Sequence, residues 1–139
     1  MKSMTEYLQF TTKKKIDFVN ITSKVNEILS RSGVKEGLCL VNTMHNSSSV
    51  FINDPDIGLL TDFKNWLDKL APRDPSSQYR HNIGSMGNAE AHLRKQIMGC
   101  EVVIAVTDWK LDLGAWERVF YGEFDGQRPK KVLVKIIGD

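Results

Sequence analysis

Short segments rich in β-branched residues recur along the whole chain, and this pattern constrains its fold more than any other feature. They read "YLQFTTKKKIDFVNIT", "GLCLVNTMH", "SSVFIND", "EVVIAVTDW", "LGAWERVFYGEF" and "KKVLVKII". Turn residues follow many of them, which is typical of strands joined as antiparallel hairpins. The first segment has a lysine-rich turn between its halves, so it predicts a hairpin of two strands.

Three other segments predict helices. Thr22 or Ser23 is expected to cap "SKVNEILSRSG", which Gly33 ends. The clearest amphipathic helix is "DPDIGLLTDFKNWLDKLAP", which ends before Pro72. Asn88 is a suitable N-cap for "AEAHLRKQIMG". With strands more numerous than helices, the chain is predicted to be α+β, a single domain over residues 1–139 with a largely antiparallel sheet or sandwich and about three helices.

Composition excludes some classes of function. Nineteen Lys and Arg against seventeen Asp and Glu leave a net charge of +2, and the basic residues are dispersed. The runs Lys13-Lys14-Lys15 and Lys130-Lys131 are expected to lie on a solvated face, so no nucleic-acid partner is predicted. No apolar run approaches the roughly twenty residues that span a membrane. The two cysteines lack Cys-x-x-Cys spacing, which suits a reducing compartment. We expect a cytoplasmic protein with no membrane partner.

The three histidines are the best candidates for chemistry. His45 ends a probable strand, His81 lies in a polar loop and His92 lies one turn into a helix. If they converged, three neutral imidazoles would form a metal site with open positions, as in catalytic zinc centres. The spacing of His81 and His92 matches no specific metal signature, so ordinary surface or core histidines are the alternative.

Hydroxyl and acidic residues near His45 are further candidates. In a strand, Ser47 and Ser49 would point to the same side as His45. A Ser–His pair is conceivable, but the chain has no Gly-x-Ser-x-Gly elbow and no identifiable triad acid, which favours hydroxyls that bind a polar ligand. Asp54 could act as a general base, although it precedes Pro55 at a helix start, where capping is the simpler explanation.

Later in the chain, Asn88 would share a helix face with His92, or would be committed to capping that helix. Gly114 and Trp116 fall in a strand-like segment, where Trp116 could contact a ligand or belong to the core. Arg128 follows in the turn "DGQRPKK", and its planar fork of donors could reach a phosphate.

Taken together, "HNSSSVFIND-PD", "YRHN", "N-A-E-A-H-L", "I-M-G-C" and "L-D-L-G-A-W-E" resemble, in order and approximate spacing, the YjbQ family, also called UPF0047. The resemblance covers nearly the whole chain. It implies a small α+β fold that assembles as a homotrimer, with a metal cluster of His45, His81 and His92 near a subunit boundary. Family members are often labelled secondary thiamine-phosphate synthases, because some have weak activity in joining a pyrimidine pyrophosphate to a thiazole phosphate.

The chain departs from the family pattern at several places. His45-Asn46-Ser47 stands for His-Thr-Ser, and Asn53-Asp54 stands for Asn-Glu, which shortens the acid. Residues 113–117 read Leu-Gly-Ala-Trp-Glu instead of Leu-Gly-Thr-Trp-Gln, so a hydroxyl is lost and an amide becomes a charge. Arg128 remains from a segment that is richer in arginine in the family.

The leading hypothesis is a metal-dependent enzyme that acts on a small phosphorylated molecule. A divalent ion, zinc or magnesium, would be held by His45, His81 and His92. Asp54 would serve as the base with Ser47 as a second catalytic group, and the ligand would be positioned by Asn82, Asn88, Trp116 and Arg128. The alternative is a non-catalytic trimer that binds a metal or small anion, and a third hypothesis is a trimer whose histidines serve only assembly.

Overall fold

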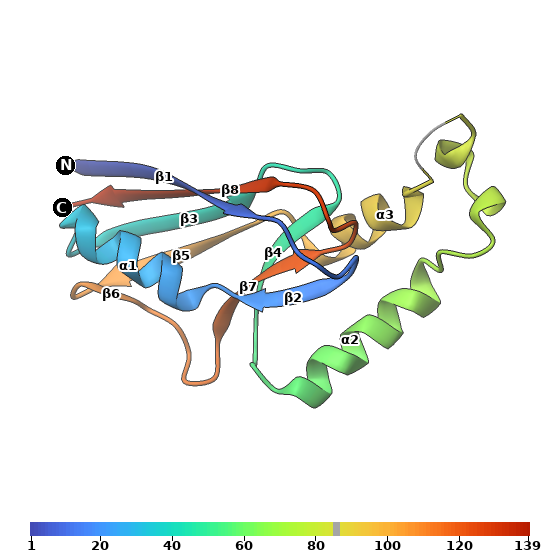
Figure 1. The fold of residues 1–139 in the computed structure, drawn as a ribbon. Helices are drawn as coiled ribbons and strands as arrows, with labels where there is room; N and C mark the ends of the chain where they lie inside the picture. Colours follow the sequence, from blue (N-terminus) through green and yellow to red (C-terminus); the bar gives the residue numbers. More distant parts are fainter. Residues whose placement is uncertain (85–86) are drawn as a thin grey trace.

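Two antiparallel sheets form the framework of the computed structural model, which describes residues 1–84 and 87–139 (Figure 1). Within these residues, the larger sheet has the strand order β1–β8–β3–β5–β6 and the smaller one β2–β7–β4. The strands of the larger sheet are β1 (Lys2–Phe10), β3 (Gly37–Thr43), β5 (Glu101–Thr107), β6 (Lys110–Leu111) and β8 (Lys130–Gly138). Those of the smaller sheet are β2 (Asp17–Asn20), β4 (Ser48–Asn53) and β7 (Arg118–Glu123). The predicted single α+β domain with antiparallel strands is therefore confirmed.

The predicted N-terminal hairpin is wrong. β1 pairs with β8, whereas β2 pairs with β7 in the other sheet. Residues 11–16 therefore connect two sheets instead of turning one strand back on the other. Phe10, at the end of β1, stacks on Tyr121 of β7, with ring centroids 4.5 Å apart. The alternation of side chains identifies a strand but carries no information about its partner, which is set by long-range packing.

Three α-helices lie among the described residues, α1 (Thr22–Ser32), α2 (Ile57–Leu70) and α3 (Ala89–Met98), with 3-10 turns η1 (Ser76–Gln78) and η2 (Arg80–Asn82) before α3. The predicted cap of α1 is wrong, because Ile21 holds the N-cap position and the Thr22 amide donates to the Asn20 side chain at 3.1 Å. Gly33 ends α1 with φ of 70°, as predicted. Asp56, and not Asp54, caps α2, since its carboxylate accepts from the Gly58 amide at 2.9 Å.

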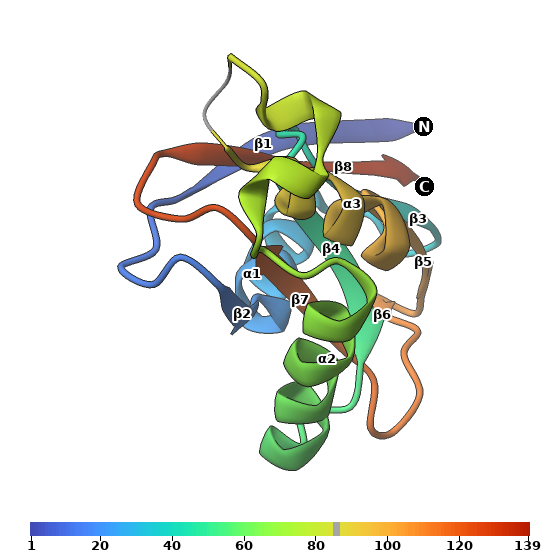
Figure 2. The same ribbon diagram turned by 90° about the vertical axis from the view of Figure 1, so that its right-hand side faces the viewer.

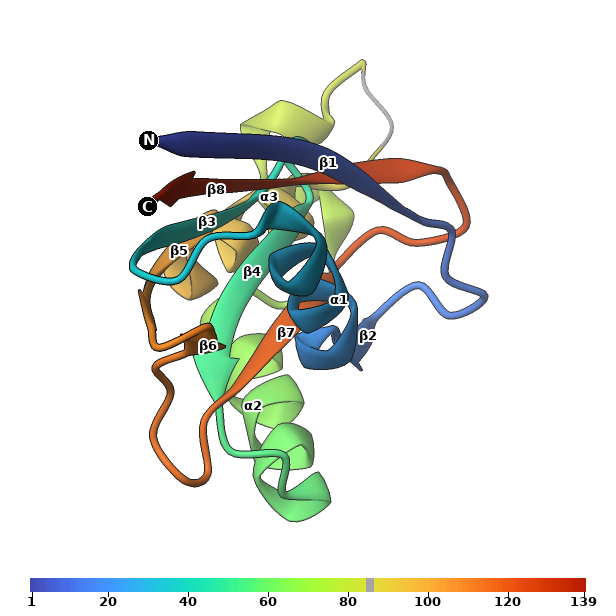
Figure 3. The ribbon, with the colours of Figure 1, turned by 90° about the vertical axis from the view of Figure 1, so that its left-hand side faces the viewer.

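The main core fills the space between the two sheets and α1 (Figure 3). Alternate residues of β8 point into it, and the pattern continues on the neighbouring strands. The buried members include Val25, Ile28, Leu29, Val41, Val50, Ile104, Val119, Tyr121, Val132, Val134 and Ile136. No helix in the described part of the chain is long and apolar enough to cross a membrane.

A second, smaller core lies under α2 and α3 (Figure 2). It consists of the buried side chains of Leu67, Ala91 and Phe124, with partly buried apolar residues around them. Arg94 of α3 adds a polar link to α2, since its guanidinium donates to the Ala71 carbonyl at 2.9 and 3.1 Å. This core holds α3, the helix that carries His92, against the end of the smaller sheet.

The segment "LGAWERVFYGEF" was predicted to be one strand, and only its second half is. β7 begins at Arg118, and residues 112–117 form a loop between β6 and β7. Trp116 lies in this loop with 71% of its surface exposed. The Glu117 carboxylate accepts from the Gly114 amide at 2.7 Å, which closes the loop locally and explains why it does not continue the strand.

Candidate functional site

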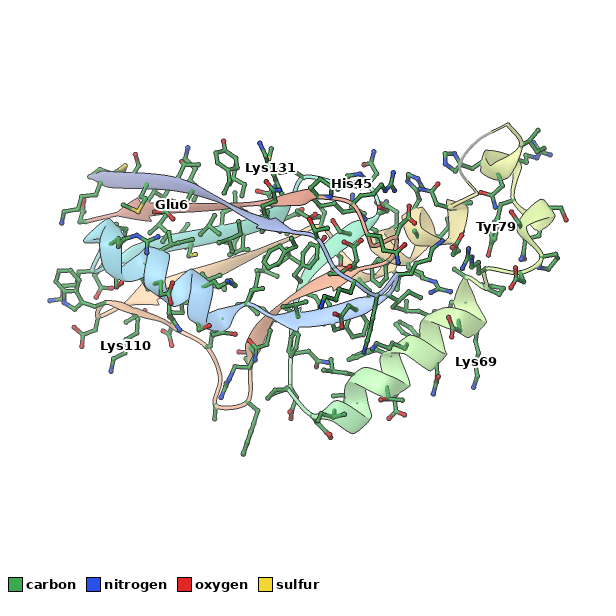
Figure 4. The ribbon with its side chains drawn as sticks, viewed as in Figure 1. Glu6, His45, Lys69, Tyr79, Lys110 and Lys131 are labelled. Carbon is green, nitrogen blue, oxygen red and sulfur yellow. The ribbon has the colours of Figure 1, made fainter. Side chains whose placement is uncertain are left out.

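Three connections meet at one end of the two sheets and bring chemistry-bearing residues together. The β3–β4 connection carries His45 and Ser47, and the β7–β8 connection carries Asp125 and Arg128. The third connection leads from η2 to the N-terminus of α3. The β4–β7 register places Ser48 opposite Glu123, so these connections start side by side. Figure 4 labels His45 at this end and Lys110 at the opposite end.

A buried ion pair lies at the centre of this site. The side chains of Lys130 and Glu123 have no exposed surface, and the ammonium donates to the Glu123 carboxylate. It also donates to the Ser47 hydroxyl and to the Asp125 carbonyl, both at 2.8 Å. The Tyr121 hydroxyl donates to the other Glu123 oxygen at 2.7 Å. Charges taken out of water need such complete pairing, because an unpaired buried charge is strongly destabilising.

Asp125 is the second anion of the site and is surrounded by donors. One carboxylate oxygen accepts from the Asn88 amide at 3.0 Å and from the Arg128 guanidinium, and the other lies 3.6 Å from Lys15 Nζ. Burial raises the pKa of Asp125, but the Asn88 hydrogen bond and the charges of Arg128, Lys15 and Lys130 outweigh burial and hold this pKa below its usual range. Lys15 is therefore partly committed to the site, although the lysine run was expected to be solvated.

His45 is held by its own neighbour. Its Nδ1 lies 2.9 Å from the Ser47 hydroxyl oxygen and 3.2 Å from the Ser47 amide nitrogen. Burial lowers the pKa of His45, and the positive charges of Lys130 and Arg128 lower it further against the opposing charges of Glu123 and Asp125. The imidazole is therefore neutral at neutral pH.

His81 and His92 form a pair in the wall of a pocket. Their ring centroids are 4.7 Å apart in a T-shaped arrangement. Burial lowers the pKa of His92, as does His81, while Asp125 and Glu90 oppose them. The pocket has a volume of about 320 Å³ and is lined by Tyr79, Arg80, His81, Ala89, His92 and Leu93.

The two asparagines of the predicted ligand set have roles that the sequence did not separate. Asn88 occupies the N-cap position of α3, but its side chain donates to Asp125 and makes no cap hydrogen bond. Asn82 satisfies the helix instead, since its Oδ1 accepts from the Ala89 amide at 3.0 Å. The Asn82 amide group also donates to the carbonyl and hydroxyl of Ser76, at 2.9 and 3.0 Å. Within the chain, both asparagines shape the site.

Two predicted site residues lie elsewhere. Asp54 follows β4 at the end opposite Ser48, five strand residues or about 17 Å away at the usual rise. Its carboxylate accepts from the Asp56 amide at 3.0 Å. Trp116 lies in the loop before β7, at that same distant end, beside a hollow of about 440 Å³ whose wall includes Gly114 and Glu117. Within one chain, neither residue approaches the histidines.

The metal-binding set is incomplete within one chain. Among residues 1–84 and 87–139, no three His, Cys, Asp or Glu side chains lie close enough together to hold one ion. His81 and His92 supply two adjacent imidazoles, whereas Nδ1 of His45 is engaged by Ser47. Within one chain, two imidazoles are therefore adjacent, and the metal set of His45, His81 and His92 stays a prediction.

Sequence reasoning did not find the residues that organise the site, Glu123, Asp125 and Lys130. A signal was available for Glu123, which stands inside the apolar run "VFYGEF", where a charge must be buried or the strand must end. Lys130 and Lys131 were treated as an exposed pair, but only Lys131 faces solvent. In a strand, adjacent side chains point to opposite faces, so two neighbouring lysines cannot both be exposed when one face is core.

Comparison with known proteins identifies relatives that span the whole chain. The family described as "UPF0047 protein YjbQ-like" matches residues 6–139. A UPF0047 protein of Methanothermobacter thermautotrophicus is 33% identical over 99% of this chain and 94% of its own length. A UPF0047 protein of Archaeoglobus fulgidus is 35% identical, covering 94% of this chain and 98% of the relative.

Solved structures agree with the fold. A YbjQ-like protein of unknown function from Sulfolobus solfataricus superposes with a TM-score of 0.94 at 30% identity, covering 99% of both chains. A hypothetical protein from Aeropyrum pernix gives a TM-score of 0.90 at 31% identity, covering 98% of this chain and 99% of that one. The two sheets and the helices around the site are thus common to these proteins.

Proposed function

This chain belongs to the UPF0047 protein YjbQ-like family, and its relative from Sulfolobus solfataricus is described as a protein of unknown function. We therefore propose a function from the site itself. The chain is proposed to be an enzyme that transfers or hydrolyses a group on a small phosphorylated molecule. Thiamine phosphate formation, from a pyrimidine pyrophosphate and a thiazole phosphate, is the reaction with which to test it. The substrate would lie in the pocket of His81 and His92.

The observation that carries this proposal is the chemistry around that pocket. Its volume of about 320 Å³ suits a small molecule. Arg80 contributes a cation to its wall, and the imidazoles of His81 and His92 add polar groups. In the adjoining network the three cations Lys15, Arg128 and Lys130 face the two carboxylates of Glu123 and Asp125, an excess of one positive charge. Phosphate groups are bound by this combination of arginine and other polar groups.

A divalent ion is part of the proposal, held by His81 and His92. Two imidazoles suit zinc better than magnesium, which prefers oxygen ligands. Bound there, the ion would polarise a phosphate oxygen of the substrate as a Lewis acid. The chain's own groups would bind and orient the phosphate, and His45 would act as a hydrogen-bond or proton donor beside it.

A non-catalytic binding protein is the second candidate, and one observation favours it. The two carboxylates of the buried network are already committed, Glu123 to Lys130 and Asp125 to Arg128 and Lys15. The acid expected to act as the base, Asp54, lies at the far end of β4. A site whose two networked carboxylates are held by ion pairs can bind an anion without turning it over.

Replacing His92 with Ala is expected to remove bound zinc and to lower pyrophosphate release at least 100-fold, because the pocket loses a metal ligand and a polar contact. Zinc content and turnover of purified wild-type and variant protein measure both effects. Gln96→Ala is the matched control, one turn further along α3 at an exposed position. Equal zinc in wild type and His92→Ala would contradict the metal site. Phosphate binding without any turnover would favour the binding protein.

We also propose that the chain assembles as a homotrimer through the outer face of the larger sheet. Leu38, Val103 and Ile137 are 48%, 59% and 37% exposed there, around a shallow apolar hollow of about 210 Å³. A contiguous apolar patch of this kind is typical of an interface. Light scattering is expected to give three times the chain mass of 15.8 kDa, and Val103→Lys is expected to give the monomer mass. Asn65→Lys, exposed on α2, is the control, and a wild-type monomer at micromolar concentration would refute the assembly.

A further inference from the structure

The Lys130 ammonium has no freedom in its hydrogen bonding. The side chain is fully buried, and its three protons have three acceptors, namely the Ser47 hydroxyl, the Asp125 carbonyl and the Glu123 carboxylate. An ammonium has three donors and no acceptor. The Ser47 oxygen must therefore accept from Lys130, which uses one of its two lone pairs.

Two groups of Ser47 approach the same nitrogen of His45. The backbone amide lies 3.2 Å from Nδ1 and the hydroxyl oxygen lies 2.9 Å from it. An amide N–H can only donate, so Nδ1 acts as an acceptor. With its oxygen accepting from Lys130, the Ser47 hydroxyl is free to direct its own proton to Nδ1 as a second donor.

We infer that Lys130, acting through the Ser47 hydroxyl, is a positioning residue that fixes the neutral His45 ring with its single proton on Nε2. A neutral imidazole carries one N–H, and the hydrogen bonds at one nitrogen decide where it lies. Since burial and the nearby cations keep His45 neutral, this tautomer is the one present at neutral pH.

The tautomer changes the role of His45 in the proposed reaction, and this consequence rests on the proposed function. A protonated Nε2 donates a hydrogen bond or a proton to an anionic oxygen, whereas a metal ligand needs a free lone pair at that atom. His45 would therefore recognise the phosphate group directly. The ion would belong to His81 and His92 alone, in agreement with the incomplete metal set of the single chain.

Nitrogen-15 NMR of ligand-free, histidine-labelled protein at pH 7.5 tests the inference without any substrate. In the wild type, Nδ1 of His45 is expected to resonate as an unprotonated nitrogen and Nε2 as a protonated one. Ser47→Ala removes one of the two donors, so a mixture of both tautomers is expected, and Ser47→Thr, which keeps a hydroxyl, is expected to restore the single form. A wild-type His45 with its proton on Nδ1 would overturn the inference.

The role of Lys130 is tested with the double variant Glu123→Gln/Lys130→Met, which removes both buried charges. The double variant is used because Lys130→Met alone leaves Glu123 unpaired and could prevent folding. A mixture of both tautomers is expected, and an unchanged tautomer would overturn the role of Lys130.

Titration with inorganic phosphate then separates the proposed function from the inferred tautomer. A shift of the His45 Nε2–H signal supports phosphate recognition. An unmoved signal with the expected tautomer contradicts the proposed ligand and leaves the tautomer established.

Discussion

Replacing Lys130 with Met is expected to lower the free energy of unfolding by about 3–5 kcal/mol, because it leaves Glu123 as an uncompensated charge in the interior. The Ser47 hydroxyl and the Asp125 carbonyl would each lose a donor as well. Small domains are stable by only about 5–15 kcal/mol, so much of the total would be lost. Urea unfolding at pH 7, followed by tryptophan fluorescence at one fixed protein concentration, measures the effect.

Lys131→Met is the matched control for this experiment. Lys131 is the next residue of β8 and faces solvent, where its ammonium lies 5.8 Å from the centre of the Tyr7 ring. Loss of that exposed contact is expected to change stability by about 1 kcal/mol or less. In Glu123→Gln/Lys130→Met the buried charge is gone, so part of the lost stability should return. A loss below about 1 kcal/mol for Lys130→Met would show that water reaches the pair.

Leu67→Ala is expected to lower the free energy of unfolding by about 2–5 kcal/mol, through lost burial and the cavity left behind. Leu67 is 1% exposed and forms the small core with Ala91 and Phe124. Since this core attaches α2 and α3 to the end of the smaller sheet, the variant should also loosen the position of His92. Urea unfolding measures the stability, and the NMR signals of His92 report the local effect.

Leu70→Ala, a substitution of the same kind in the same helix, is its control. Leu70 is 52% exposed, so truncation removes far less buried surface, and the expected change is about 1 kcal/mol or less. Equal losses of unfolding free energy for the two variants would mean that α2 does not pack on Phe124 through the face that carries Leu67. A stable Leu67→Ala protein with an unchanged His92 would show that α3 is held by Arg94 and other contacts alone.

Local sequence patterns predicted the elements of the fold better than their partners. The helix from Ile57 to Leu70 and the glycine that ends α1 follow from apolar spacing and backbone conformation, which depend on a few neighbouring residues. The N-terminal hairpin was wrong because β1 and β2 each pair with a strand from the last quarter of the chain. Such pairing depends on the packing of the whole core, and no local pattern encodes it.

In the candidate site, too, the sequence predicted which residues belong to the site better than it predicted their contacts. Polar surroundings at strand and helix ends were enough to single out the histidines, and the structure places His81 beside His92. The roles of Asn82 and Asn88 could not be predicted from neighbouring residues in the sequence. Both stand close to the start of α3, and only their distances show that Asn82 satisfies the helix while Asn88 binds Asp125.

By itself, the sequence determined that the chain is an α+β domain with antiparallel strands and about three helices, since periodicity and turn residues act locally. Only the tertiary structure decided that Lys130 is buried against Glu123 and reaches Ser47. Ser47 is 83 residues from Lys130 in the sequence, and their contact exists only once both sheets have formed. The proton position on His45, and with it the chemistry proposed for the site, depends on that long-range contact.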